Sequence, residues 1–309
     1  MEEKKSVKYD EEWEAFGKPI ILPALAFEEQ ERLKTGKNRY GSIECFDETR
    51  VILRGKCDYV HANFITSAEG KKMFIGSQGP THDSMKDFWI MLLQEKVEKV
   101  IMLCGIFEES MKNGQKQMLE KSAKYWPVGE NFDFKEFQVH FKSSVQKDYI
   151  DGEVHEYVVT TILEIIESSS KKPLQTVHHI HHRSWPDHGI PILVAPIVDI
   201  FKNHVEKSLE TQKPVVVHCS AGIGRTGCFI AAYYCMDLFK KDALQSVSET
   251  VVQLRRMRAR LVQRASQYLF IHLLLIELIE LEYGDKHDEI KDKLNSLIKN
   301  LKKPRKHGK

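Results

Sequence analysis

The chain of 309 residues has a hydrophobic content of 42% and a formal net charge of +2, so it can bury one large core and carries no bulk charge typical of nucleic-acid binding. Its six cysteines show no CxxC motif and no paired spacing, which argues against a zinc site or a disulfide framework and favours a reducing compartment. The charged start Met1-Glu2-Glu3-Lys4-Lys5 precedes no apolar stretch of signal-peptide type. These features predict an intracellular, cytoplasmic protein without a transmembrane segment.

Three parts are expected along the chain. Residues 1–30 are rich in charged residues, with isolated aromatic residues and two prolines. They predict an N-terminal extension with a lead-in helix. Residues 31–284 form one domain, in which strand, helix and parallel-strand patterns precede an antiparallel meander at 132–183 and a helix at 193–208. The most apolar run, 268–281, contains His272, Glu277 and Glu280, so it predicts a buried helix rather than a membrane span.

Residues 285–309 form an amphipathic and then basic tail. A basic end of this kind is most often a solvated tail. It is also typical of a nuclear signal or of a segment that contacts an anionic surface.

The stretch 215–227 carries the chemistry. Three valines predict a buried strand, and residues 228–236 predict a helix, so a strand-to-helix loop lies between them. Five residues separate Cys219 from Arg225, two of them glycines and two others small, which lets the backbone point its N–H groups inward at the mouth of a helix. Such a loop holds an anion and favours a thiolate, so Cys219 is a candidate nucleophile, and Arg225 can hold two phosphate oxygens.

These residues also have interpretations that involve no nucleophilic chemistry. A lone cysteine at the end of an apolar strand is more often a small buried hydrophobe. A glycine-rich strand-to-helix turn also occurs in nucleotide-binding proteins, but the Walker lysine and the spaced glycine triplet of a dinucleotide fold are absent. The full string His-Cys-x5-Arg-Thr-Gly, at 218–227, outweighs both alternatives.

That string resembles the signature loop of protein tyrosine phosphatases of the cytosolic, non-receptor type, which are cysteine-dependent phosphatases. Residues 58–65 (Asp-Tyr-Val-His-Ala-Asn-Phe-Ile) are similar to a strand of the same family, with His61 in place of an asparagine. Residues 185–191 (Trp-Pro-Asp-His-Gly-Ile-Pro) resemble its mobile acid loop. The resemblance covers about residues 30–284 and implies a three-layer α/β/α fold, with a twisted mixed sheet flanked by helices and the phosphate-binding loop between a strand and a helix.

The family further implies a role for each matching residue. Cys219 is the nucleophile, Thr226 assists the sulfur as it leaves, Asp187 is the general acid, and Gln263 orients the attacking water. Tyr40 walls the phosphotyrosine pocket. The residues that bind substrate are Tyr40, Asp187, Ser220, Ala221, Gly222, Ile223, Gly224, Arg225, Gln263 and Gln267, and the supporting residues are Glu108, His218, Arg255 and Arg258.

Some matches have alternatives or departures. Glu108 and Glu109 are almost equally well explained as solvated charges on a polar loop at 108–117, and either glutamine could lie on a helix surface. Ser42 stands where the family usually has an acid that holds the peptide backbone, which predicts weaker peptide capture. The histidines at 178, 179, 181 and 182 do not share one face and adjoin no carboxylate or thiolate cluster, so no metal or other cofactor is expected.

The expected function is hydrolysis of phosphotyrosine in proteins through a cysteinyl phosphate. The alternatives are an inactive phosphatase that binds phosphotyrosine, and a dual-specificity or lipid phosphatase with a shallower pocket. A thiolate nucleophile is also readily oxidised, which predicts reversible inactivation by peroxide.

Overall fold

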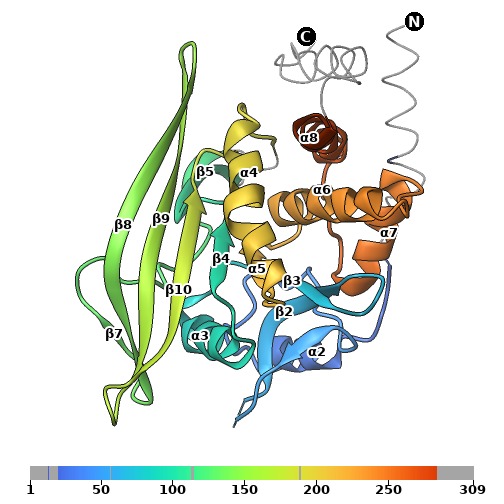
Figure 1. Ribbon diagram of the computed structural model, residues 1–309. Coiled ribbons are helices and arrows are strands. Elements are labelled where there is room, and N and C mark those ends of the chain that lie inside the picture. Colours follow the sequence, from blue (N-terminus) through green and yellow to red (C-terminus); the bar gives the residue numbers. More distant parts are fainter. Residues whose placement is uncertain (1–12, 14–19, 56, 113–114, 188, 284–309) are drawn as a thin grey trace, which may run out of the picture.

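The computed structural model describes Trp13 and residues 20–55, 57–112, 115–187 and 189–283. Within these residues nine strands form one mixed sheet (Figure 1). In spatial order they are β1 (Arg50–Ile52), β2 (Tyr59–Thr66), β3 (Lys72–Ser77), β11 (Val215–His218), β4 (Lys99–Met102), β10 (Pro173–His182), β9 (Val154–Glu167), β8 (Phe137–Asp151) and β7 (Phe132–Asp133).

The centre of the sheet is parallel and its two sides are antiparallel. β11 pairs in parallel with both β3 and β4, and β10 pairs in parallel with β4. Val215, Val216 and Val217 have no exposed surface, as expected for β-branched residues on a strand that is covered on both faces. The carboxyl end of β11, where the signature loop starts, therefore opens from the rigid middle of the domain.

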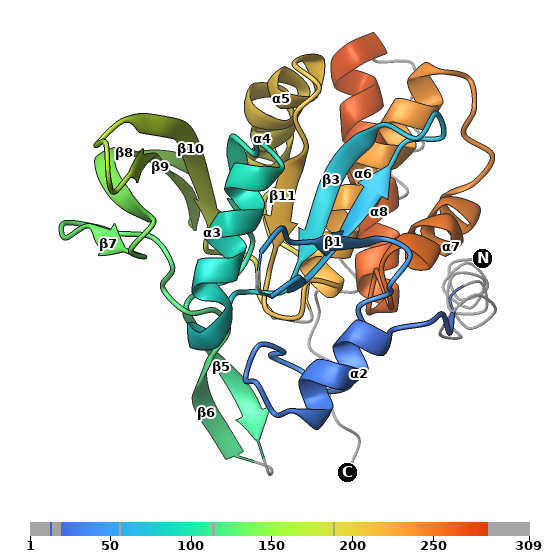
Figure 2. The ribbon, with the colours of Figure 1, turned by 90° about the horizontal axis from the view of Figure 1, so that it is seen from below.

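Helices cover both faces of these central strands, which gives the expected three layers. Figure 2 shows α3 (Met85–Gln94) on one side of β11 and β3, and α6 (Gly224–Lys240) with α8 (Ala265–Tyr283) on the other. The remaining helices are α2 (Leu25–Arg32), η1 (His82–Ser84), α4 (Ala195–Ile200), the π-helix η2 (Phe201–Glu206), α5 (Lys207–Glu210) and α7 (Val247–Met257). The predicted α/β/α fold is confirmed.

The segment at 108–117 differs from the expected polar loop. It belongs to a separate two-stranded sheet of β5 (Phe107–Lys112) and β6 (Gln115–Glu120). Asn113-Gly114, which lies outside the described residues, is a dipeptide typical of two-residue hairpin connections. The polar composition of the strands hid this hairpin, because neither face of it is buried in the core.

The antiparallel meander expected at 132–183 is present as β7 to β10, and within it β8 and β9 form a long hairpin (Figure 1). None of the helices in the described part of the chain combines the length and apolar character needed to cross a bilayer. Most of the N-terminal extension and the whole tail from 285 lie outside the described residues, and so do the interpretations made of them.

Candidate active site

The loop after β11 turns its carbonyl groups outward. The carbonyls of Ser220, Ala221, Gly222 and Ile223 all accept hydrogen bonds from outside the loop. The donors are the amides of Gly79, Val262 and Gly227 and the guanidinium of Arg258. The N–H groups of residues 220–223 donate no hydrogen bond within the described part of the chain. The loop therefore presents a ring of amide donors at the N-terminus of α6, next to the nearly buried thiol of Cys219.

Gly222 is required by the shape of this ring. Its φ of +69° lies in the left-handed region, and a Cβ at this position would lie 2.0 Å from the carbonyl oxygen of Ser77. Any side chain would push the loop away from β3. Glycine at 222 thus lets the loop pack on the sheet while its amides face inward.

Arg225 lies in the first turn of α6 and is held by a carboxylate. Its side chain is only 2% exposed, and its two terminal nitrogens bond both oxygens of Glu108 at 2.6 and 2.9 Å. Burial by itself would lower the pKa of Arg225, but the bidentate bond to Glu108 outweighs it, so the pKa lies above its usual value. The guanidinium remains charged and is fixed in one plane at the edge of the loop.

The segment that contains Trp185 and Asp187 contacts Arg225 beside the signature loop. Arg225 Nη1 donates to the carbonyl of Trp185 at 2.9 Å, and Arg225 Nη2 lies 3.2 Å from Asp187 Oδ1. The other oxygen of Asp187 accepts from Lys121 Nζ at 2.6 Å. Asp187 and Cys219 both line one cavity of about 590 Å³, together with Tyr40, Arg225 and Gln263.

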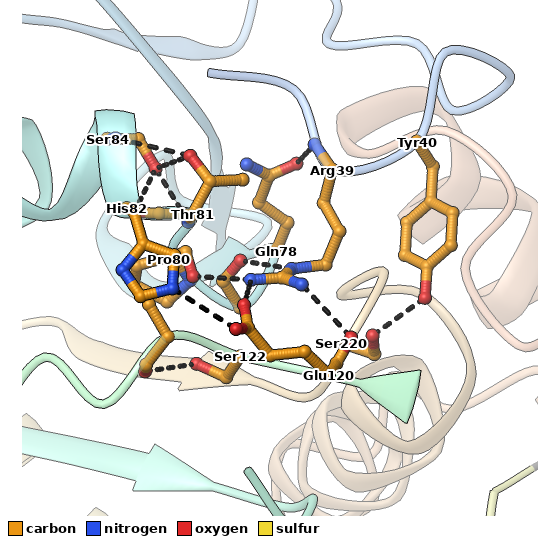
Figure 3. A network of polar contacts seen from close by, with 12 residues as sticks. Arg39, Tyr40, Gln78, Pro80, Thr81, His82, Ser84, Glu120, Ser122 and Ser220 are labelled. Atoms are coloured by element: carbon orange, nitrogen blue, oxygen red, sulfur yellow. Dashed lines mark hydrogen bonds and ion pairs between the residues drawn. The ribbon is translucent and has the colours of Figure 1, made fainter. Parts of the chain in front are cut away.

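Tyr40 stands at the side of this cavity. Its hydroxyl lies 2.8 Å from Ser220 Oγ, which links the tyrosine to the signature loop. The preceding residue, Arg39, ties the tyrosine loop to the rest of the domain (Figure 3). Its guanidinium donates to the carbonyls of Gly79, Pro80 and Glu120, and its amide donates to Gln78 Oε1.

His218 supports the loop from inside the core. Its Nδ1 lies 3.1 Å from the carbonyl of Cys219 and its Nε2 lies 2.6 Å from the hydroxyl of Tyr125. A carbonyl can only accept, so the imidazole proton lies on Nδ1 and Tyr125 donates to Nε2. Burial lowers the pKa of His218 to about 4, although the bond to Cys219 opposes this, so the ring is neutral at pH 7.

Comparison of the sequence with known protein families agrees with this geometry. Residues 34–277 match the family model described as protein-tyrosine phosphatase. This chain belongs to the protein-tyrosine phosphatase family. It is 32% identical over 264 residues to the human tyrosine-protein phosphatase non-receptor type 9, covering 80% of this chain and 42% of that protein. The mouse and rat proteins of the same name match it equally well, and the chain spans about two fifths of the length of these relatives.

The two glutamines that the phosphatase resemblance singles out both reach the cavity. Gln267 is buried; its Oε1 accepts from the amide of Gln263 and its Nε2 lies 3.5 Å from the carbonyl of Gly189. Gln263 is half-buried and its side chain lines the cavity. The helix-surface alternative therefore does not apply to Gln267, and the side chain of Gln263 lines the cavity without a hydrogen bond to any other described residue.

Arg258 supports the phosphatase loop directly. It is fully buried, donates to Gly222 and Ala221, and also bonds Asn63 Oδ1 at 2.8 Å. His61, the residue that replaces the family's asparagine, faces Arg258 with Nδ1 at 3.4 Å and Ile43 O with Nε2 at 2.9 Å. Burial and the charge of Arg258 lower the pKa of His61 to about 3. A neutral histidine thus connects the arginine below the loop with the segment that follows Tyr40.

Arg255 contacts the signature loop only indirectly. It donates to the carbonyls of Leu261 and Val262, and the amide of Val262 in turn donates to Ile223. Its guanidinium also lies 5.2 Å from the ring of Trp13. Arg255 therefore supports the signature loop through the segment that leads to Gln263.

Thr226 departs from its expected contact. Its hydroxyl is buried and has no hydrogen-bond partner within the described residues, so the bond to the sulfur of Cys219 is not made here. The assignment of Thr226 as an aid to the leaving sulfur remains a prediction.

Sequence reasoning missed Lys121. Its side chain is 6% exposed and its ammonium contacts Asp187, yet it lies in a short polar stretch that matches no motif of charge or spacing. Ser42, by contrast, lines the cavity mouth as an exposed residue, where it brings no charge to the rim.

Proposed function

We propose that this chain hydrolyses phosphotyrosine in proteins, by transferring the phosphoryl group to Cys219 and then to water. One observation carries the proposal: a ring of amide donors, a fixed guanidinium and a carboxyl side chain converge with a cysteine on one cavity. The amide ring and Arg225 can hold the three non-bridging phosphate oxygens. The sulfur then lies in line to attack phosphorus.

In the first step the P–O bond to tyrosine breaks as the S–P bond forms. The electron pair leaves with the phenolic oxygen, which takes a proton from Asp187. Lys121 and Arg225 both contact Asp187, and these cations favour its ionised form. A bound phosphate dianion offsets that positive charge, so the carboxyl group can hold a proton when the substrate is present.

In the second step water attacks the phosphocysteine. Asp187 is now a base and accepts a proton from the water, while the sulfur leaves as a thiolate in the amide ring. Gln263 lies where an amide can orient that water without competing as a nucleophile. Arg225 and the loop amides stabilise the negative charge in both transition states.

The position of Tyr40 in the cavity wall supports tyrosine as the substrate residue. Tyr40 bonds Ser220 and lines the cavity, so a substrate ring can pack against its ring while the phosphate reaches the loop. A phosphoserine is shorter and leaves its phosphate away from Cys219. Ser42 contributes no charge at the rim, so the phosphotyrosine ring rather than the peptide backbone supplies most of the binding.

The substrates are phosphotyrosine-containing proteins, and a cysteine nucleophile requires a reducing compartment such as the cytoplasm. Within the chain we assign residues 31–284 to the phosphatase domain.

The test is hydrolysis of phosphotyrosine and phosphoserine peptides by the purified chain, with Cys219→Ser as the control. We expect release of phosphate from the phosphotyrosine peptide only, and none from Cys219→Ser. Tight binding of the phosphotyrosine peptide without turnover would instead identify a phosphotyrosine-binding protein. Comparable turnover of phosphoserine would identify a dual-specificity enzyme.

A further inference from the structure

A buried carboxylate outside the catalytic cavity joins the two ends of the acid loop. Glu156 lies on β9 and is 2% exposed. Its Oε2 lies 3.0 Å from Nε2 of His182, the last residue of β10 before the loop. Its Oε1 accepts from the amides of Ile192 and Leu193, after the loop, at 3.0 and 3.3 Å.

The strand register explains why these groups meet. Val158 pairs with His182 across β9 and β10, and Glu156 lies two residues before Val158 on the same face of the sheet. The chain then leaves β10, passes Trp185 and Asp187, and returns to the same point on β9. One side chain therefore fixes the entry and the exit of the segment that carries Asp187.

The cost of releasing this contact is high. His182 has no exposed surface, and its Nδ1 has no hydrogen-bond partner within the described residues, so Glu156 is its polar partner there. Burial alone would raise the pKa of Glu156, but the bonds from His182 and from the two amides outweigh it and hold the pKa below its usual value. An ionised buried carboxylate that lost these donors would be unsatisfied.

We infer that Glu156 is a positioning residue for the proposed general acid. It pins both ends of the acid loop to β9, so that Asp187 moves about two fixed points and reaches Arg225 and Lys121 in one geometry. The inference rests on the proposed phosphatase function, because it assigns to Glu156 an effect on proton donation by Asp187. Glu156 itself touches neither the cavity nor Cys219.

The kinetic test uses two substrates that differ in leaving group. Phenyl phosphate needs a proton donor for its leaving oxygen, whereas 2,4-dinitrophenyl phosphate has a stable leaving anion and needs little help. In Glu156→Ala, a misplaced Asp187 should lower kcat for phenyl phosphate by about tenfold to a hundredfold. The loss for 2,4-dinitrophenyl phosphate should be less than about threefold. An equal loss of both rates in folded Glu156→Ala would overturn the inference.

Matched variants separate positioning from other effects. Glu156→Gln keeps an oxygen for the two amides, and its NH2 group can donate to Nε2 of His182 once the imidazole proton moves to Nδ1, so it should restore part of the activity. His155→Ala removes the neighbouring, exposed histidine, which pairs with Asp148 at 2.8 Å, and should change neither rate. In an Asp187→Asn background, adding Glu156→Ala should cause no further loss, because the acid is already absent. A further loss there would contradict the inference.

Amide hydrogen exchange gives a readout that does not depend on turnover. The amides of Ile192 and Leu193 should exchange faster in Glu156→Ala than in the wild type or in His155→Ala. Unchanged exchange would overturn the inference. If the wild type hydrolysed neither substrate, the proposed function would fail, and exchange alone would decide whether Glu156 pins the loop. If Glu156→Ala does not fold, His182→Ala removes one of the three bonds and should show the same leaving-group pattern at smaller size.

Discussion

At the scale of single residues, the site depends on side chains whose geometry is fixed by a second group. Arg225 is planar and is held by both oxygens of Glu108, and its two terminal nitrogens also contact the carbonyl of Trp185 and Oδ1 of Asp187. Asp187 is held in the same way by Lys121 and Arg225. The geometry of the candidate site is therefore set by pairs of residues that are far apart in the sequence.

Arg225→Lys tests the planar fork. A lysine keeps the positive charge but cannot bind two oxygens in one plane, so we expect kcat for aryl phosphates to fall by about a hundredfold or more. Arg260→Lys is the matched control, because Arg260 also bonds both oxygens of a carboxylate, Glu44, but is exposed. Steady-state kinetics of both variants would show the difference. Equal activity of Arg225→Lys and the wild type would mean that charge alone suffices.

Oxidation tests the reactivity of Cys219. Burial raises the pKa of Cys45 to about 11 and of Cys235 to about 12, and it also raises the pKa of Cys104 and of Cys228, so these thiols are poor nucleophiles. We expect mild peroxide to inactivate the enzyme with modification of Cys219, and a thiol reductant to restore activity. Mass spectrometry would locate the modified residue. Inactivation with an unmodified Cys219, for example through the half-buried Cys57, would contradict this prediction.

At the scale of elements, the β5–β6 hairpin decides which of two adjacent glutamates serves the site. Alternation along β5 turns Glu108 toward Arg225, while Glu109 pairs with Lys116 across the hairpin at 2.7 Å. The amide of Gly105 also donates to Oε1 of Glu108 at 2.7 Å, so a backbone group and Arg225 together fix the orientation of the carboxylate. The sequence left open whether Glu108 and Glu109 are both solvated charges. The strand register places Glu108 at Arg225 and leaves Glu109 on the exposed side of the hairpin.

Glu108→Gln and Glu109→Gln form a matched pair. Replacing Glu108 removes the charge that balances a nearly buried guanidinium, so we expect kcat to fall by about tenfold or more. Glu109→Gln loses only an exposed ion pair and should change kcat by less than about twofold. Kinetics with an aryl phosphate would compare them, and an equal loss in both variants would show that the hairpin as a whole, rather than Glu108, matters.

At the scale of the whole molecule, the domain contains several histidines that fold in the neutral state. The pKa of His61 and of His181 is lowered to about 3, and that of His218 to about 4, in each case mainly by burial. The pKa of a histidine in the unfolded chain is about 6.5. On acidification the unfolded chain therefore binds protons at pH values where these histidines of the folded chain do not. The stability that these neutral rings confer is complete above about pH 6.5 and is lost as the pH falls toward 4 and 3.

His61→Asn tests this linkage. At pH 5 each such histidine should cost about 2 kcal/mol of stability relative to pH 7. Restoring the family's asparagine should therefore flatten the fall in stability between pH 7 and pH 5. Urea unfolding at several pH values would measure the slope, with exposed His82→Asn as the control. An unchanged slope in His61→Asn would mean that the imidazole takes up its proton at the same pH in the folded and in the unfolded chain.

The sequence by itself determined the parts of the site that are local. Cys219, Arg225 and the glycines between them lie within one turn of chain, and their spacing shapes the amide ring whatever surrounds it. The strand and helix patterns likewise predicted the layered sheet, because burial on both faces leaves runs of β-branched residues such as Val215-Val216-Val217.

Only the tertiary structure decided which distant side chains meet. Lys121 reaches Asp187 from 66 residues away, Glu108 reaches Arg225 from 117 residues away, and Glu156 joins the two ends of the acid loop. These pairings depend on strand register and on which face of a strand is covered. A one-residue slip would reverse them, and no spacing in the sequence records the register.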